Sequence, residues 1–173
     1  MTTAAVREPE ATDDCRDLFR KMTAGVAVIT AGGPQGPLGM TASAVMSLSL
    51  RPPLIIACLT QGSGTLQAVR RSGVFGLHLL RDDQQHIAET FARPCGGEEK
   101  FAAVHSRTAA GVPTLVDALA WATCKVQRVI DGGDHRLLIG RVVDSRVGDG
   151  NPLVWHHSNY WQITDPVDLY RSA

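Results

Sequence analysis

The stretch from Gly39 to Leu54, GMTASAVMSLSLRPPL, mixes short hydroxylated side chains with small and medium-sized apolar ones. A plain buried strand carries more Val and Ile and fewer hydroxyl groups that need partners, whereas a plain loop does not contain so many apolar residues. The mixture favours backbone and hydroxyl groups that contact a ligand both polar and flat. An edge strand that binds nothing has a similar composition, and that alternative stays open here.

A second group of residues, Gly62–Thr65, consists of two glycines and two hydroxyl-bearing residues at the start of a predicted helix. The free N–H groups and the positive dipole end at a helix start form an anion site, to which Ser63 and Thr65 can add hydroxyl donors for a phosphate. The same residues also cap helices that bind no ligand. The sequence contains neither G-x-G-x-x-G nor G-x-x-x-x-G-K-[ST], so no Rossmann or P-loop site is predicted.

Three further residues are candidates by type and place. His135 leaves the predicted DGGD hairpin beside Asp134, where an imidazole that titrates near neutral pH can contact a polar substrate; an ordinary turn residue is the alternative. Lys100 can neutralise a phosphate and Phe101 can cover an aromatic ring, although a surface lysine beside a core phenylalanine is also ordinary. No G-x-S-x-G motif, Cys–His pair or carboxylate pair supports hydrolase chemistry.

The composition limits the classes of protein and ligand. At 173 residues and 44% hydrophobic content, the chain is expected to form one domain, residues 12–173, after a flexible tail at residues 1–11. Lys+Arg and Asp+Glu both number 17, so nucleic acid and membrane surfaces are not expected partners. No apolar run reaches the ~20 residues of a spanning helix and no signal peptide is apparent, so a cytoplasmic location is expected. The scattered cysteines and histidines predict free thiols and no metal site.

The elements that must position these residues are mostly strands. A closed antiparallel barrel is favoured over a doubly wound parallel sheet, because only short helices separate the strands. The segment 100–120 is poorly periodic and is expected to be loop with short helical pieces. Strands are predicted at 25–30, 40–50, 54–59, 74–80, 121–130, 135–147 and 159–164, and helices at 13–22, 65–73 and 82–92.

In their order along the chain, these motifs resemble the short-chain flavin reductase family. The most specific matches are TASA followed by SLSLRPPL, and GDH before an apolar strand; the resemblance extends over about residues 15–163. It implies an FMN-binding split barrel, a mainly β, antiparallel Greek-key fold with short flanking helices. It also implies a homodimer, because pocket walls in such barrels commonly come from two chains.

The resemblance assigns roles to residues in this sequence. The segment Thr41–Ser47 would lie along the flavin, Cys58 and Leu59 would line the same pocket, and Ser63–Thr65 would hold the phosphate. Lys100 and Phe101 would lie on a loop near the flavin, and His135 near the nicotinamide nucleotide. Ala44 and Gly64 depart from the usual residues of the family, which puts one flavin hydrogen bond in doubt. The complete set of predicted cofactor-binding residues is Met40, Thr41, Ala42, Ser43, Ala44, Ser47, Cys58, Leu59, Ser63, Gly64, Thr65, Lys100 and Phe101.

The function implied by the resemblance is transfer of a hydride from NADH to FAD or FMN. NADH is expected in preference to NADPH, and the reduced flavin would supply a partner flavin-dependent monooxygenase. Such a reaction requires ring stacking and exclusion of water but no acid or base side chain, so His135 is expected to position NADH rather than transfer a proton. A non-catalytic flavin-binding or sensing protein on the same fold is the alternative. A small barrel that binds single-stranded nucleic acid is disfavoured by the even charge and the 5% aromatic content.

Overall fold

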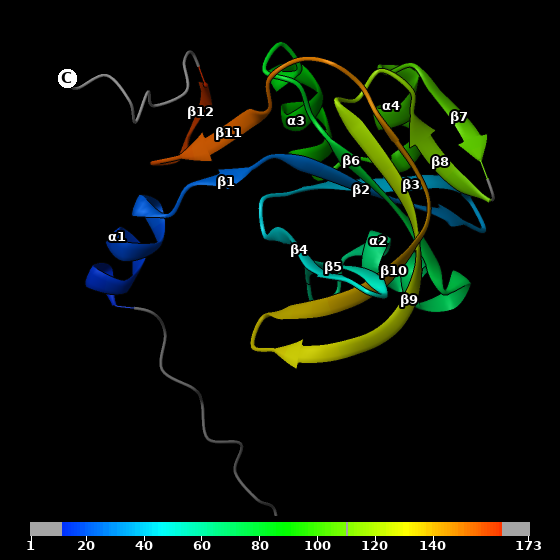
Figure 1. The fold of residues 1–173 in the computed structure, drawn as a ribbon, viewed down its shortest axis with the longest axis horizontal. Helices are drawn as coiled ribbons and strands as arrows, with labels where there is room; N and C mark the ends of the chain where they lie inside the picture. The colour runs from blue at the N-terminus through cyan, green and yellow to red at the C-terminus, as the bar shows by residue number, and fades with distance from the viewer. Residues whose placement is uncertain (1–11, 110, 164–173) are drawn as a thin grey trace, which may run out of the picture.

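The computed structural model describes residues 12–109 and 111–163, and the predicted tail at residues 1–11 lies outside this part of the chain. A curled antiparallel sheet of seven strands forms its centre (Figure 1), with the order β3-β2-β6-β9-β10-β5-β4. The outermost strands β3 and β4 are consecutive in the chain, and the Cys58 N–H donates to the Ala44 carbonyl at 2.9 Å, near the point where the barrel closes. The strands are β2 (Ala27–Gly33), β3 (Gly36–Ala42), β4 (Val45–Leu50), β5 (Pro53–Thr60), β6 (Val74–Leu79), β9 (Ala120–Gly132) and β10 (His135–Val147).

A smaller sheet of three strands adjoins this barrel, with the order β1-β11-β12. Its strands are β1 (Ala24–Gly25), β11 (Leu153–His156) and β12 (Asn159–Gln162). Leu153 fixes the sheet to the barrel, because its N–H donates to the Leu80 carbonyl and its own carbonyl accepts from the Val26 N–H, both at 2.9 Å. The mainly β, antiparallel barrel predicted from the sequence is therefore confirmed.

Four helices connect the strands in the described part of the chain: α1 (Asp13–Lys21), α2 (Gly64–Ser72), α3 (Gln85–Ala92) and α4 (Gly97–Ala102). The predicted helix 13–22 is confirmed, but Thr12 rather than Asp13 caps it, with its hydroxyl accepting from the Cys15 N–H. Ser63 caps α2, and the predicted stop at Gly73 is confirmed by a left-handed residue with φ of 71°. A left-handed position after a helix is one that glycine occupies without steric cost.

Two clusters of buried side chains form the core, one on each face of the curled sheet. The cluster inside the barrel contains Ile29, Leu59, Phe75 and Leu138. The other lies under α3 and α4, where the Phe91 and Phe101 rings pack edge to face with centroids 5.1 Å apart. Figure 1 shows α3, α4 and the β11–β12 hairpin on the same side of the main sheet. The helices therefore position the end of β3 from outside the barrel.

The expectation of loop across 100–120 was wrong. The segment contains part of α4 and a hairpin of β7 (Ser106–Ala109) and β8 (Val112–Leu115), which form a two-stranded sheet. All four β8 residues are buried, and Thr30 on the neighbouring strand β2 donates its hydroxyl to the Pro113 carbonyl at 2.5 Å. Each strand is only four residues long, which is too short to show an alternation of polar and apolar residues in the sequence. None of the helices in the described residues is long and apolar enough to cross a membrane.

Candidate functional site

The corner between β3 and β4 borders a cavity of about 250 Å³. Thr41 and Ser43 come from this corner, Val26 from the entry to β2, and Ala92 from the last turn of α3. The two sheets of the protein thus meet at the cavity, and its lining contains three hydroxyls, one of them phenolic, and two large aromatic rings but no charged side chain. The lining residues are Val26, Thr41, Ser43, Ala92, Trp155 and Tyr160.

Side chains from β3 and α4 hold the end of α3 against this corner. The Thr41 hydroxyl donates to the Ala88 carbonyl at 2.6 Å. The Lys100 ammonium donates to the Gly39 carbonyl at 3.2 Å and to the Phe91 carbonyl at 3.0 Å. Only 7% of Lys100 is exposed, and burial lowers the pKa of its ammonium group. The corner is therefore fixed before any ligand binds.

Lys100 and Phe101 do not lie on a loop beside the cavity, as the sequence predicted. They belong to helix α4 rather than to a loop, and Phe101 is buried against Phe91 in the outer core. The Lys100 ammonium group already donates to two carbonyls. A buried ammonium group needs such partners, because burying it without hydrogen bonds is costly. In this arrangement, neither side chain lines the cavity of the β3–β4 corner.

The other predicted residues of β3, β4 and β5 divide between the core and the surface. Ala42 and Leu59 are buried in the core inside the barrel, and Met40 packs against it. Their side chains are therefore turned away from a ligand, although their backbone groups stay at the corner. Ala44 and Ser47 are exposed, and Cys58 is half-buried; burial raises the pKa of the Cys58 thiol.

The start of α2 follows directly after β5. The Ser63 hydroxyl accepts from the Leu66 N–H at 3.2 Å, which is the capping arrangement anticipated as the alternative to a phosphate site. Its O–H proton stays available to a ligand. Thr65 is buried, and a Cβ added at Gly64 would meet nothing within 4 Å, so the backbone there is open to an approaching group.

His135 lies at the same end of the barrel as the start of α2. It pairs with Thr60, the last residue of β5, and the Gln61 N–H donates to the Asp134 carbonyl at 2.8 Å. Its Nδ1 is 2.7 Å from the Asp134 carboxylate, and this contact lowers the pKa of Asp134. The DGGD hairpin thus joins His135 to the segment that leads into α2.

The structure brings the predicted residues together in two groups. One consists of the β3–β4 corner with Cys58, and the other of the α2 start with His135; β5 connects the two. Sequence reasoning missed Trp155 and Tyr160, because aromatic residues in a terminal strand look like ordinary core. In the turn between β11 and β12, His157 has a φ of 51°, and its ring centroid lies 4.8 Å from that of His156.

The described residues of the site contain no cluster of metal-ligating side chains. No group of three or more His, Cys, Asp or Glu side chains is close enough to hold a metal ion in that part of the chain. A second cavity, of about 350 Å³, lies between the β2–β3 hairpin and β7–β8. Of the predicted site residues, only Phe101 lines it, so the cavity at the β3–β4 corner fits the predictions better.

Comparison with known proteins identifies relatives across nearly the whole chain. The family model described as flavin reductase like domain matches residues 19–164. The reductase component of a 4-nitrophenol 4-monooxygenase/4-nitrocatechol 2-monooxygenase from Rhodococcus opacus is 38% identical over 170 residues, which cover 97% of this chain and 88% of that protein. An NADH:FMN oxidoreductase from Rhodococcus erythropolis is 33% identical over 158 residues, covering 87% of this chain and 81% of that protein.

A solved structure has the same fold as this chain. The NADH:FAD oxidoreductase of Streptomyces globisporus C-1027, solved in complex with NAD and FAD fragments, superimposes with a TM-score of 0.84 at 26% identity. The alignment covers 92% of this chain and 100% of that chain. The similarity therefore includes both the barrel and the three-stranded sheet that closes the cavity.

Proposed function

Since the chain belongs to the flavin reductase like domain family, we propose that it is an NAD(P)H-dependent flavin reductase, which transfers a hydride from NADH to FAD or FMN. The observation that carries this function is the match to reductases of this kind over almost the full length of the chain. The arrangement of the two groups of residues along β5 supports the assignment of ring and phosphate sites.

The cavity at the β3–β4 corner fits a neutral, flat ring. Its lining has no charged side chain, and about 250 Å³ is below the ~300–1,000 Å³ of pockets that enclose a whole drug-sized ligand. One ring system can enter while the rest of the molecule extends along β5. The open backbone at Gly64 and the hydroxyls of Ser63 and Thr65 then meet a phosphate at the positive end of α2.

The protein's own contribution to the reaction is binding, orientation and exclusion of water. A bound flavin supplies the hydride acceptor, so no side chain has to carry a proton at the reacting atoms. Thr41 and Lys100 fix the corner, whose small residues would let a bound ring approach the backbone. His135, held by Asp134 at the mouth, orients the nicotinamide nucleotide. Prior orientation of two reactants is worth several kcal/mol of the barrier.

The reduced flavin goes to a partner oxygenase. Relatives whose names describe them as the reductase component or subunit of a monooxygenase support this kind of partner. A reductase that supplies a separate oxygenase has to release the reduced flavin.

The protein works as a homodimer. Helix α1 buries none of its residues and exposes Leu18 and Phe19, its C-cap residue Met22 is also exposed, and the edge strand β4 exposes Met46, Leu48 and Leu50. Exposed apolar groups of this size are typical of interfaces, and an uncovered apolar edge strand invites aggregation. A second copy of the chain covers both surfaces by symmetry.

A steady-state assay that combines NADH or NADPH with FAD, FMN and riboflavin tests the function. We expect NADH oxidation that depends on added flavin and saturates with it, and faster turnover with NADH than with NADPH. Heat-denatured protein with the same flavins is the control for direct reaction in solution. Tight flavin binding without NADH or NADPH oxidation would show a non-catalytic flavin-binding protein instead.

A further inference from the structure

We propose that Trp155 and Tyr160 form an aromatic wall against which the flat, neutral ring of one reactant packs, opposite Thr41 and Ser43. This inference rests on the proposed flavin reductase function and deepens it, because it names the side chains that hold the ring. The shared chemistry is that of an uncharged, flat nitrogen heterocycle that presents an N–H donor at its edge, either from the ring itself or from an amide substituent. The isoalloxazine of the flavin and the carboxamide-bearing ring of NADH are its two sources.

The aromatic wall is rigidly built. Trp155 and Tyr160 are direct cross-strand neighbours in the β11–β12 hairpin, and their ring centroids lie 4.9 Å apart at an interplanar angle of 64°. The turn at His157 and Ser158 has positive φ at both residues, which matches the twist of a two-residue hairpin and fixes its register. The hydrogen bonds of Leu153 to Leu80 and Val26 hold the same hairpin to the barrel.

The facing wall selects the kind of ring edge. The Thr41 hydroxyl proton is used in the bond to the Ala88 carbonyl, so toward the cavity the oxygen acts only as an acceptor. It therefore suits a ring N–H or amide N–H rather than a carbonyl. The Ser43 hydroxyl has no hydrogen bond within residues 12–109 and 111–163 and can donate or accept.

Trp155 and Tyr160 also have polar groups to offer. Neither the Trp155 indole N–H nor the Tyr160 hydroxyl makes a hydrogen bond within the described residues. By contrast, the Trp161 indole N–H donates to the His156 carbonyl at 3.0 Å. Burial, followed by the charge of Glu89, raises the pKa of Tyr160, so its O–H remains a donor across the neutral range. The two rings thus present an apolar face with donors at its edge.

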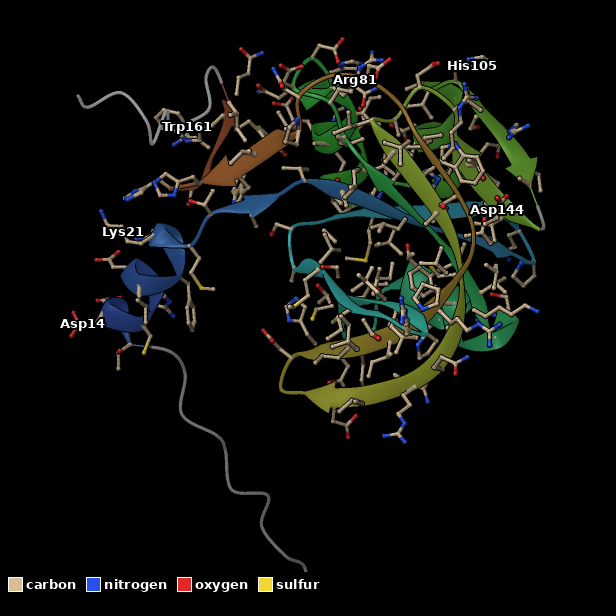
Figure 2. The ribbon with its side chains drawn as sticks, in the orientation of Figure 1. Asp14, Lys21, Arg81, His105, Asp144 and Trp161 are labelled. Carbon is tan, nitrogen blue, oxygen red and sulfur yellow. The ribbon has the colours of Figure 1, made fainter. Side chains whose placement is uncertain are left out.

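The competing explanation is that both rings only complete the core. They do pack against the outer core cluster beside Val26 and Phe91, so loss of a ring can also loosen the fold. The test therefore needs a ligand readout and a control on the same hairpin. Trp161 provides that control, because it is 53% exposed, belongs to β12 of the same hairpin and lies outside the cavity lining; it is labelled in Figure 2.

The experiment uses riboflavin, which carries the ring without a phosphate. Riboflavin affinity and the fluorescence lifetime of the bound ring are measured for the wild type, Trp155→Leu, Trp155→Phe and Trp161→Leu, together with the KM for NADH and the thermal unfolding of each variant. Stacking on an aromatic side chain quenches flavin fluorescence at contact. We expect Trp155→Leu to weaken riboflavin binding about tenfold and to lengthen the fluorescence lifetime of the bound ring. The riboflavin affinities of Trp155→Phe and Trp161→Leu should stay within about threefold of the wild type.

Each outcome has one meaning. A tenfold loss of riboflavin affinity in Trp155→Leu that is absent in Trp155→Phe supports the inference and assigns the cavity to the flavin ring. Unchanged riboflavin binding with a KM for NADH raised tenfold supports it with the nicotinamide ring instead. Unchanged riboflavin binding and NADH kinetics in Trp155→Leu overturn it, as does an equal loss in Trp155→Phe accompanied by lower thermal stability. In these last cases, wild-type NADH oxidation still tests the flavin reductase function separately.

Discussion

His78 is a fully enclosed imidazole in the middle of the main sheet. It is 1% exposed; its Nδ1 is 3.1 Å from the Val28 carbonyl, and its Nε2 has no hydrogen-bond partner among the described residues. The Nδ1 therefore carries the proton and donates it to that carbonyl. Burial lowers the pKa of His78 to about 4, because an imidazolium here would lose its hydration. The folded protein keeps this side chain neutral.

The first prediction concerns stability in acid. The pKa of His78 is about 4 in the folded state and about 6.5 in the unfolded chain, so from pH 6.5 downward the unfolded state binds the proton first. The unfolding free energy is unaffected above pH 6.5 and falls by up to about 3 kcal/mol as the pH approaches 4. Chemical denaturation of the wild type, His78→Leu and the exposed-site control His86→Ala at pH 7.5 and 4.5 measures this. The prediction is contradicted if the unfolding free energy of the wild type decreases between pH 7.5 and 4.5 by no more than that of His78→Leu.

The second prediction concerns His135. If this residue orients the nicotinamide nucleotide, His135→Ala lowers kcat/KM for NADH by about 10- to 100-fold, which corresponds to roughly 1.4–2.7 kcal/mol, and flavin affinity stays the same. The matched control is His105→Ala, since His105 makes a similar contact with a carboxylate, Asp117 at 3.3 Å. Steady-state kinetics at saturating flavin across a pH series provide the measurement. Unchanged NADH kinetics would make His135 an ordinary turn residue.

The third prediction concerns the start of α2. Ser63→Ala together with Thr65→Ala removes two hydroxyl donors from the proposed phosphate site, and we expect FMN affinity to fall about tenfold or more. Loss of the Ser63 cap also costs about 1 kcal/mol of helix stability, but this affects all ligands alike. The ratio of FMN to riboflavin affinity is therefore the measured quantity. An unchanged ratio would place the phosphate elsewhere.

At the scale of elements, α3 and α4 act as supports for the end of β3. Two side chains, Thr41 and Lys100, reach the carbonyls of Ala88 and Phe91 in the last turns of α3. The last four carbonyls of a helix have no partners within the helix, and the Phe91 carbonyl is one of them, so the Lys100 contact satisfies a group that would otherwise need water. The Thr41 hydroxyl binds one turn earlier, at the Ala88 carbonyl. This attachment places Ala92, the last residue of α3, in the wall of the cavity at the β3–β4 corner.

The fourth prediction tests the attachment through Lys100. Replacement by Met keeps most of the aliphatic stem but leaves the Gly39 and Phe91 carbonyls without their donor, so we expect about 1–3 kcal/mol of lost unfolding free energy. Riboflavin binding should weaken in the same variant, because the β3–β4 corner loses its support. Lys125→Met on the exposed side of β9 is the control and should change neither. Unaltered stability in Lys100→Met would contradict the structural role.

Most of the barrel could be predicted from the sequence, since its strands are long or bounded by strong turn signals. The predicted segment 135–147 coincides with β10, and DGGD forms the turn before it. The four-residue strands β7 and β8 were missed because they are too short to show a period. Lys100 was misjudged because its two carbonyl partners come from distant elements. Trp155 and Tyr160 were missed for the same reason, as their position depends on how two sheets meet.

At the scale of the whole molecule, the exposed apolar groups on α1 and β4 form the proposed dimer interface. Figure 1 shows α1 standing apart from the barrel, and Figure 2 shows Asp14 and Lys21 extending from it. Its polar side carries the Arg16–Asp13 and Arg20–Asp17 pairs, which are exposed and contribute little stability by themselves. The apolar side therefore determines where α1 packs.

The fifth prediction follows for the oligomeric state. Leu18→Glu together with Phe19→Ser introduces a charge and removes the largest ring on the apolar side of α1, so we expect the dimer to dissociate to monomers at micromolar concentration. Asp14→Ser on the same helix is the control and should remain dimeric. Sedimentation velocity measures both variants and the wild type. A wild type that sediments as a monomer, or a double variant that sediments as a dimer, would contradict the proposed interface.

Helix α1 has nine residues and buries none of them within its own chain, whereas isolated helices shorter than ~12–15 residues are marginal in water. Its backbone hydrogen bonds should therefore open easily in a lone protomer and become protected only when a second copy covers the apolar side. Amide hydrogen exchange in α1 should then slow as the protein concentration rises through the dissociation constant, while exchange in β6 at the barrel centre stays constant. In the proposed dimer, the final step of folding for this segment is the encounter with a second copy of the chain.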